Sequence, residues 1–393
     1  MSVEAVISTQ VIDTTSVGRS LMTAADSAAA RTAADAQVTL VSGTNIKTVN
    51  STSLLGSGDI AVGLSGTGSV DNAALRADGT GGTTLQTSAF VIADNATASP
   101  NNTVNHASIS ATGGTTNVSV SIVPKGTGAF SLAVPDGTTT GGNARGANAV
   151  DLQTLFYAAS TVASGTRSFC AGYGNTASGT NSVALGLRNV ASGLTSFAFG
   201  TTATASAADT FVAGYQCVAS AQGSVAIGYQ CGASAFFGFA YGYSAIADRS
   251  GMRAFAGGRF AASGDCQSVD FRAWNKTTNS TATTLFLDGS TTRLTITSGK
   301  VMSAICRICG IKSDGSEVAN YVRRVVIKNV GGTTSLVGSV ETIGTDIEDN
   351  ASTDVAITAD NTNDALQINV TGIAAETWRW VAVVEGLEIA YGT

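Results

Sequence analysis

A repeat of 14 residues in the middle of the chain constrains the fold more than any other feature of the sequence. From residue 168, six consecutive segments carry a glycine at the fifth position and an alanine at the tenth. The glycines are Gly172, Gly186, Gly200, Gly214, Gly228 and Gly242. The alanines begin one unit earlier and are Ala163, Ala177, Ala191, Ala205, Ala219, Ala233 and Ala247. A seventh segment is expected to carry one extra residue, so that its glycine is Gly257 and its alanine Ala262.

The length of this repeat selects its structure. Fourteen residues are too few for a pair of helices, and a glycine in every unit disfavours a helix. Two short strands and two turns fit, which make one coil of a β-solenoid. In the segment SVAIGY, Gly228 would let the backbone bend where a side chain would clash. At the usual strand spacing, seven such coils would extend for about 34 Å.

Both sides of the repeated strand are apolar. Val183 and Leu185 point to one side and Ala184 to the other, because side chains alternate along a strand. One side can fill the narrow interior of the coil, but the other then needs a cover that no nearby segment supplies. Continuous apolar stripes are typical of interfaces, and cyclic symmetry can provide the partner from the same sequence. The sequence therefore predicts a homotrimer.

Composition excludes several other classes of protein. Of the 393 residues, only 12% are charged and three are proline, which is unlike a disordered chain. The net charge of −6, without a basic cluster, argues against nucleic acid as a partner. The N-terminal segment does not resemble a secretion signal, and no run of about 18 apolar residues predicts a membrane span. We expect synthesis in a cytoplasm, and thiols rather than disulfides at the six cysteines.

Two repeat segments carry a resemblance to a known family. SVAIGYQCGASA and SVALGLRNVASG resemble the head repeat of YadA-type trimeric autotransporter adhesins, over about residues 163 to 264. The resemblance implies a trimeric, left-handed parallel β-roll. The expected absence of a signal peptide, coiled-coil stalk and membrane anchor disfavours a bacterial adhesin. It predicts another class of protein that contains the same rod-forming repeat.

The sequences that flank the repeat indicate which class of protein this is. GRSLMTAADSAAARTAA and GTNIKTVNSTSLLGSGDI resemble N-terminal regions of tailed-bacteriophage tail fibres and related virion proteins. The ending DALQINVTGIAAETWRWVAVVEGLEIAYGT resembles the C-terminal domain of many phage fibres and tailspikes. In those proteins this domain is a trimeric tip or trimerisation module, so the resemblance implies a protein of the virion.

Together these features predict a mainly β, elongated trimeric fibre. It would combine short N-terminal helices, the left-handed parallel β-roll of 14-residue repeats, and a C-terminal antiparallel β-sandwich of about eight strands. The helices are expected over 17–23 and 25–36. Four parts are expected: a virion-attachment segment, a β-rich neck or shaft, the β-roll, and the tip or trimerisation domain. Their ranges are 1–38, 39–160, 161–270 and 271–393.

Cysteine and histidine offer little chemistry. Cys306 and Cys309 form a CxxC pair, but a tetrahedral zinc site needs two more ligands and none is near in sequence. We therefore expect two thiols in or beside a strand. Cys217 and Cys231 share one repeat position and should stack on adjacent coils, and we expect reduced thiols in preference to a disulfide. His106, the single histidine, has no partner motif for nucleophilic catalysis.

The carboxylates and tryptophans are interpreted as structural. The repeat region contains Asp209, Asp248 and Asp265, and the tip contains Asp346, Glu348, Asp349, Asp354, Asp360 and Asp364. These are expected in loops, without the spacing of a calcium-binding EF-hand. Trp378 and Trp380 share one strand face, opposite Arg379, and are expected in the core or a trimer interface. We assign no catalytic, cofactor-binding or metal residue, and expect no cofactor and no enzymatic activity.

The predicted function is attachment. The chain is expected to be a homotrimeric tail fibre or short spike, located in the virion. Its N-terminal region would bind phage tail or other virion proteins, and its C-terminal tip would bind a glycan or protein of the host surface, without inserting into the membrane. Exposed tip loops such as SDGS and NTND are better placed for such contact than any strand. Two alternatives stay open: a purely structural head fibre or decoration protein, and a polysaccharide-depolymerising tailspike.

Overall fold

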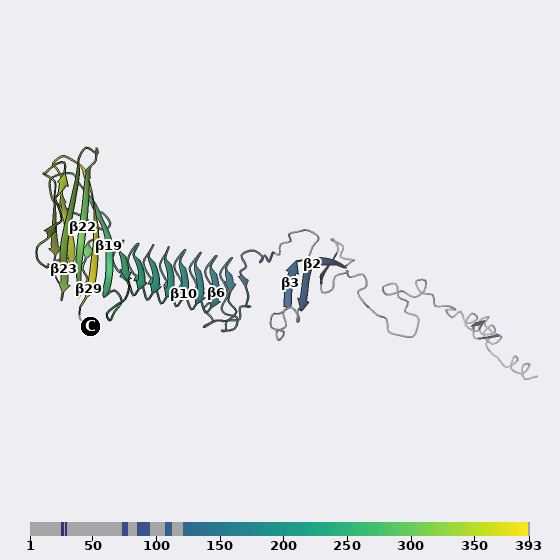
Figure 1. The fold of residues 1–393 in the computed structure, drawn as a ribbon. Helices are drawn as coiled ribbons and strands as arrows, with labels where there is room; N and C mark the ends of the chain where they lie inside the picture. Colours follow the sequence, from purple (N-terminus) through teal and green to yellow (C-terminus); the bar gives the residue numbers. More distant parts are fainter. Residues whose placement is uncertain are drawn as a thin grey trace, which may run out of the picture. The chain divides into compact units, whose positions relative to one another are not determined.

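The computed structural model describes residues 25, 26, 28, 29, 73–77, 85–94, 107–111 and 121–391, with the backbone alone for the three early strands. The chain divides into two compact units, Met1–Ile122 and Val123–Thr393. The first contains one antiparallel sheet (Figure 1). Its strands are β1 (Ala73–Ala77), β2 (Leu85–Asp94) and β3 (Ala107–Ala111), in that order.

The predicted N-terminal helices lie almost wholly outside the described residues. Within them, Ala28 and Ala29 are helical, and their backbone amides donate to Oδ1 of Asp26 at 2.9 and 2.8 Å. This is the arrangement of an aspartate N-cap. Nothing else of 17–23 or 25–36 is described except Ala25.

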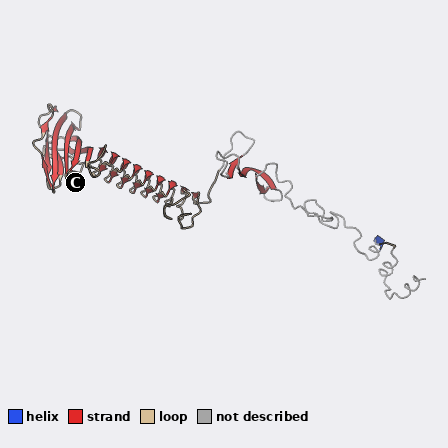
Figure 2. Cartoon of the chain, turned by 60° about the horizontal axis from the view of Figure 1, so that its bottom comes forward, coloured by secondary structure: helices blue, strands red, loops and turns tan. Residues whose placement is uncertain are grey.

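A parallel β-solenoid forms the first part of the second unit, as the repeat predicts (Figures 1 and 2). The long strand of each coil pairs in register with the same strand 14 residues later. These strands are β6 (Phe169–Tyr173), β8 (Val183–Leu187), β10 (Phe197–Thr201), β12 (Phe211–Tyr215), β14 (Val225–Tyr229), β16 (Phe239–Tyr243) and β18 (Arg253–Ala256). Two shorter strands, β4 (Phe130–Ser131) and β5 (Val150–Leu152), precede them in the same sheet.

The second strand of each coil has two residues and belongs to a separate parallel sheet. These strands are β7 (Thr176–Ala177), β9 (Val190–Ala191), β11 (Thr204–Ala205), β13 (Val218–Ala219), β15 (Gly232–Ala233) and β17 (Ile246–Ala247). The alanine of the repeat is the second residue of each, and it is buried. The residue before each long strand is buried too, and in four of the seven strands it is a serine. The hydroxyl of Ser182, for example, donates to the carbonyl of Gly179 at 2.7 Å.

The repeated glycine is required by the backbone. At Gly214, φ is +127°, a value that L side chains rarely adopt, and a Cβ there would collide with the carbonyl oxygen of Gly228 in the next coil. The equivalent position of the seventh coil differs from the sequence prediction, because Ala256 and not Gly257 pairs with Gly242. The extra residue therefore follows the strand and does not interrupt it.

The long sheet continues without a break from the solenoid into the C-terminal tip. There it is antiparallel, and its main strands are β19 (Cys266–Thr277), β29 (Trp378–Ala390), β22 (Lys300–Lys312) and β23 (Val318–Val330). The strands β24 (Thr333–Leu336), β25 (Glu341–Thr342) and β26 (Ile347–Glu348) pair with β23. In the described part of the chain this sheet has 16 strands.

A second antiparallel sheet completes the tip. It contains β20 (Thr283–Thr284), β21 (Leu294–Thr295), β27 (Asp354–Asp360) and β28 (Ala365–Thr371). Buried residues of both sheets, such as Trp380 and Ile368, belong to one hydrophobic core that also includes the alanines of the solenoid. The predicted antiparallel sandwich is thus present. Among the described residues, no helix has the length and apolarity needed to cross a membrane.

Candidate interaction surface

The side of the solenoid's long strands that faces away from its interior forms a continuous apolar surface, called here the outer face. It consists of the first and third residues of six strands: Phe169, Ala171, Val183, Leu185, Phe197, Phe199, Phe211, Ala213, Val225, Ile227, Phe239 and Tyr241. The alanine between them, such as Ala184, is fully buried inside the coil. The structure therefore decides what the sequence left open: the small residue faces inward, and the large one outward.

Large side chains on the outer face remain accessible in the single chain. Phe199 is 52% exposed, Phe211 39% and Ile227 37%. The rings of Phe197 and Phe211 stack across adjacent coils, with centroids 5.1 Å apart. None of the 12 side chains is charged, which is unusual for a surface in contact with water.

Both edges of the outer face carry exposed apolar side chains beside polar ones. At the end of each long strand, Tyr215, Tyr229 and Tyr243 stack with centroids 4.9 Å apart, and we call these three residues the tyrosine ladder. At the opposite edge, the turn before the long strand exposes Leu194 in one coil, and Phe236 and Phe237 in another.

In the tip, the same side of the sheet carries charges between exposed apolar residues. Asp270 lies opposite Arg253 on one neighbouring strand and opposite Glu385 on the other. Ion pairs join Asp270 to Arg272, and Glu385 to Arg307, the latter at 2.7 Å. A hollow of about 240 Å³ lies here, lined by Tyr241, Arg253, Phe255, Ser268, Val269, Asp270, Glu385 and Gly386.

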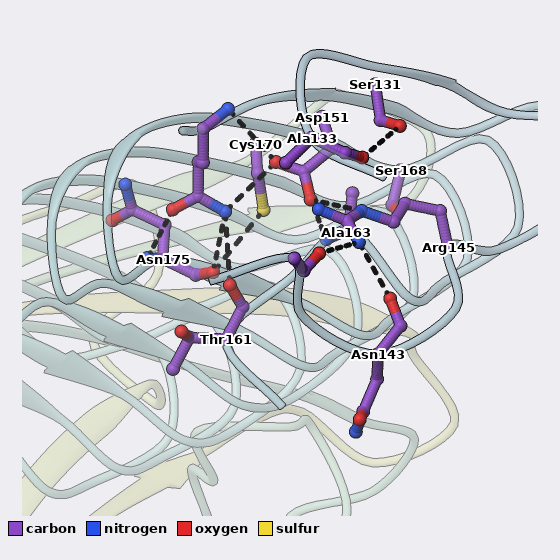
Figure 3. A network of polar contacts seen from close by, with 12 residues as sticks. Ser131, Ala133, Asn143, Arg145, Asp151, Thr161, Ala163, Ser168, Cys170 and Asn175 are labelled. Carbon is purple, nitrogen blue, oxygen red and sulfur yellow. Dashed lines mark hydrogen bonds and ion pairs between the residues drawn. The ribbon is translucent and has the colours of Figure 1, made fainter. Parts of the chain in front are cut away.

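A buried polar network closes the N-terminal end of the solenoid (Figure 3). Nε of Arg145 contacts Oδ2 of Asp151 at 2.9 Å, and both side chains are almost wholly buried. The amide of Gln153 takes the backbone-pairing place of a residue of the preceding coil, because its oxygen accepts the Asn175 backbone amide at 2.7 Å and its nitrogen donates to the Asn175 carbonyl at 3.2 Å. The Arg145 Nη2 atom has no protein partner within this network.

A second buried cluster joins the last coil to the tip. Gln267 takes such a backbone-pairing place as well, since its amide pairs with both the backbone amide and the carbonyl of Ile246. The fully buried carboxylate of Glu388 accepts from Gln267 at 3.0 Å, from Lys300 at 2.7 Å, and from Arg249. The two glutamines therefore end the solenoid at both sides, and Glu388 ties one end to the sandwich.

The cysteines singled out in the sequence lie in the tip and in the solenoid. Cys306 is buried and Cys309 exposed, on opposite faces of β22, and burial raises the pKa of Cys306 to about 12. Cys217 and Cys231 stack on adjacent coils as predicted, and both are free thiols. The Cys231 amide donates to Sγ of Cys217 at 3.4 Å, and the hydrogen bond between the thiols raises the pKa of Cys217 and lowers that of Cys231. Within the described residues, no group of three or more metal-ligating side chains occurs. His106 lies outside them.

In the repeat region, the three predicted carboxylates each make a structural contact. Asp209 accepts from Thr195 of the neighbouring coil at 2.6 Å, which lowers its pKa. Asp248 pairs with Arg249 at 3.0 Å, and Asp265 accepts three backbone amides of the loop before it.

The carboxylates of the tip are likewise engaged. Arg323 binds Asp346 with two nitrogens, Asp349 accepts the Val318 amide, and Asp364 accepts from Thr334. Glu348 accepts from the Tyr321 hydroxyl, Asp360 pairs with Arg293 at 3.1 Å, and Asp354 accepts the Val355 amide.

The two tryptophans lie in the core, which is one of the two locations predicted from the sequence, the other being a trimer interface. Trp378 and Trp380 are buried and stack with centroids 5.5 Å apart, while Arg379 is exposed on the other face. Each indole N–H has a partner: Trp380 donates to Thr277 and Trp378 to Glu376, both at 3.0 Å. Their rings are thus not available for stacking on a sugar.

Comparisons with known proteins find only distant similarity to two solved structures. No family model matches the chain, and no curated protein does. Among solved structures, the chain is similar to tailspike protein gp49 of Acinetobacter baumannii bacteriophage Fri1, a capsular polysaccharide depolymerase, with 9% identity over 56% of this chain and a TM-score of 0.21. It is also similar to the tailspike protein of Acinetobacter phage vB_ApiP_P1, with 11% identity over 57% and a TM-score of 0.17. The chain spans 40% and 51% of those two chains.

One prediction from the sequence is corrected by this comparison. We expected no enzymatic activity, yet one of the two similar structures is a depolymerase and therefore an enzyme. The prediction rested on carboxylates that looked scattered along the sequence, which is a weak basis for excluding an activity. It was wrong to exclude enzymes, and we do not carry it forward. The low TM-scores give this likeness no further weight.

Proposed function

We propose that the chain is a homotrimeric, receptor-binding fibre or short spike of a bacteriophage virion. The observation that carries this proposal is the outer face: six consecutive strands, from Phe169 to Tyr241, present apolar side chains outward without one charge. A single chain would leave these side chains in water. Three chains around one axis would bury them, because each copy supplies the same stripe to the others.

The arrangement of the second unit suits such a fibre. Its solenoid has a hydrogen-bonded coil-to-coil ladder, ended by Gln153 and Gln267, and would act as a stiff shaft of the YadA head type, wound to the left. The antiparallel sandwich would be the distal tip, whose loops contact a glycan or protein of the host surface. Residues 1–38 would attach the trimer to phage tail or other virion proteins.

Light scattering on the purified full-length chain tests the trimer. We expect a mass three times the 39.2 kDa of one chain, retained after dilution. Crosslinking followed by denaturing electrophoresis should give the same mass. A monomer at all concentrations would remove the basis of the proposal. Immunogold labelling of phage particles then separates a tail fibre from a head fibre, because gold would be seen at the tail or over the capsid.

Attachment is tested with purified host polysaccharides. The trimer is incubated with capsular polysaccharide and lipopolysaccharide from the phage's host, and both retention and release of oligosaccharides are measured. We expect retention, with an avidity that three copies of a weak site provide. Released oligosaccharides would establish a depolymerase. Neither retention nor release, together with gold over the capsid, would favour the decoration protein.

A further inference from the structure

Two exposed phenylalanines at one edge of the outer face have no role within their own chain. Phe236 is 56% exposed and Phe237 69%, in the turn between β15 and β16. In its coil, Phe237 occupies the position that Arg167, Asn181, Thr195, Asp209, Gly223 and Gly251 occupy in others. All seven have φ between 51° and 67°, a left-handed conformation that suits Asn, Asp and Gly but is costly for a bulky ring.

Strain of this kind persists where another interaction compensates for it. In the single chain, the ring of Phe237 lies over Gly223 of the preceding coil, where an added Cβ would meet its Cδ1 and Cε1. More than half of the ring's surface nevertheless faces solvent. A contact that compensates for the strain at Phe237 would therefore come from another chain.

The opposite edge of the outer face offers a matching aromatic surface. Both faces of Tyr229 are covered, by the rings of Tyr215 and Tyr243, and Arg259 lies over the Tyr243 ring, 5.8 Å from its centroid. Ring edges are therefore part of what Tyr229 and Tyr243 expose, at 40% and 39%. Aromatic rings pack favourably edge to face, which is the geometry that an arriving phenylalanine would find.

Cyclic symmetry brings these two edges together at the same height. Three flat faces around one axis meet edge to edge, and a rotation about that axis leaves the height along it unchanged. Phe237 lies between Tyr229 and Tyr243 along the chain, in the coil that connects them. After the rotation, it faces the space beside these two tyrosines of the next copy.

We propose that Phe236 and Phe237 of each copy pack against Tyr229 and Tyr243 of the next copy. This contact rests on the homotrimer of the proposed function and assigns the residues that join its edges. Each copy would give its phenylalanines to one neighbour and its tyrosines to the other, so the ring closes after three contacts. Within one chain the contact cannot form, because six strand residues separate Phe237 from Tyr243 by about 20 Å.

An engineered disulfide tests this directly. The full chain carrying Phe237→Cys and Tyr229→Cys is oxidised by dissolved oxygen with a copper catalyst, which removes two electrons and two protons from each thiol pair. We expect a covalent species of three chains on non-reducing electrophoresis, lost after reduction. Two cysteines this far apart in one chain cannot bond to each other. Each single variant, and Tyr229→Cys combined with exposed Val337→Cys in the tip, should give no such species.

The outcomes separate this contact from the trimer itself. If the variant is a trimer by light scattering but gives no covalent species, the Phe–Tyr contact is wrong and the homotrimer stands. If the unmodified chain is a monomer, the proposed function fails first.

A second variant, Phe237→Asn, keeps the test independent of crosslinking. Asparagine suits this φ, as Asn181 shows, so the single chain should fold at least as well as before. The proposed contact nevertheless predicts at least a tenfold rise in the concentration at which the trimer half-dissociates. A trimer of unchanged or greater affinity would overturn the contact.

Discussion

The solenoid and the tip share one sheet and one core, but they fill the core differently. Inside the solenoid, the long strands contribute small side chains: Cys170, Ala184, Ala198, Val212, Ala226, Ala240 and Ala254. The tip buries Trp378, Trp380, Tyr321 and Phe271. A narrow coil leaves no room for large residues, so its stability comes from the regular ladder between neighbouring coils, as in other repeat proteins. The tip instead depends on large side chains between two sheets.

The largest effect is expected from the backbone of the solenoid. Gly214→Ala should prevent native stacking, because the new Cβ collides with the Gly228 carbonyl and the positive φ adds about 1–3 kcal/mol of strain. Soluble yield and circular dichroism measure the loss. Gly251→Ala is the control, since a Cβ there meets nothing within 4 Å. If both variants gave the same soluble yield and circular dichroism, the close spacing of the coils would not be the reason that glycine is required at position 214.

The second largest effect is expected at the junction between the solenoid and the tip. Glu388→Ala should cost about 3–5 kcal/mol, because it leaves the buried Arg249 and the nearby Lys300 without their carboxylate. Chemical denaturation measures the free energy of unfolding. Glu341→Ala removes an exposed ion pair with Arg324 and should change stability by about 0–1 kcal/mol. A mild effect of the first variant would mean that the solenoid and tip are coupled by packing alone.

Cavity-forming variants compare the two cores directly. Ile308→Ala in the tip should cost about 2–5 kcal/mol, since a fully buried side chain is truncated among large neighbours. Val212→Ala in the solenoid should cost about 1.5 kcal/mol, the transfer energy of two carbons, because Ala198 and Ala226 already occupy this position in adjacent coils. Denaturation curves of both variants give the comparison. A larger loss at Val212 would reverse the distinction drawn here.

The side-chain ladder of the solenoid is expected to contribute less. Asn189 donates to the carbonyls of Leu185 and Gly200, both at 2.7 Å, and accepts the Ala203 amide at 2.8 Å. Asn189→Ala leaves these groups unpaired and should cost about 1–3 kcal/mol, seen as a lower melting temperature. The control Ser178→Ala changes an exposed side chain and should melt like the parent. If the parent, Asn189→Ala and Ser178→Ala melted at the same temperature, the side-chain ladder would not contribute to stability.

The smallest effect is a pH dependence in a tip loop. Hydrogen bonds from Thr292 above all, and from the backbone of Ser290 and Thr291, lower the pKa of Asp288. A lowered folded-state pKa contributes stability above the unfolded value of about 3.9, and this is lost as pH falls through the folded value. Between pH 5 and pH 2, the melting temperature should fall more for the parent than for Asp288→Asn. Parallel curves would contradict this.

The sequence by itself determined the solenoid. A strict period of 14 residues with one glycine leaves only a coil of two strands and two turns, so the existence of the coils and the pairing register of the first six could be derived before the structure. Alternating residues in the tip likewise predicted an antiparallel sandwich of about eight strands. These inferences succeeded because they depend on local periodicity, which is written in neighbouring residues.

Only the tertiary structure decided which residues the coils present and how they end. Both sides of the repeated strand are apolar, so the inward direction of Ala184 follows from the width of the closed coil. The pairing of Ala256 with Gly242, and the roles of Gln153, Gln267 and Glu388, depend on partners as many as 139 residues away in sequence. The long strand β19 also escaped prediction, because its alternation is partly charged on the outer side. Contacts between distant segments leave no periodic trace, and therefore cannot be inferred from one sequence.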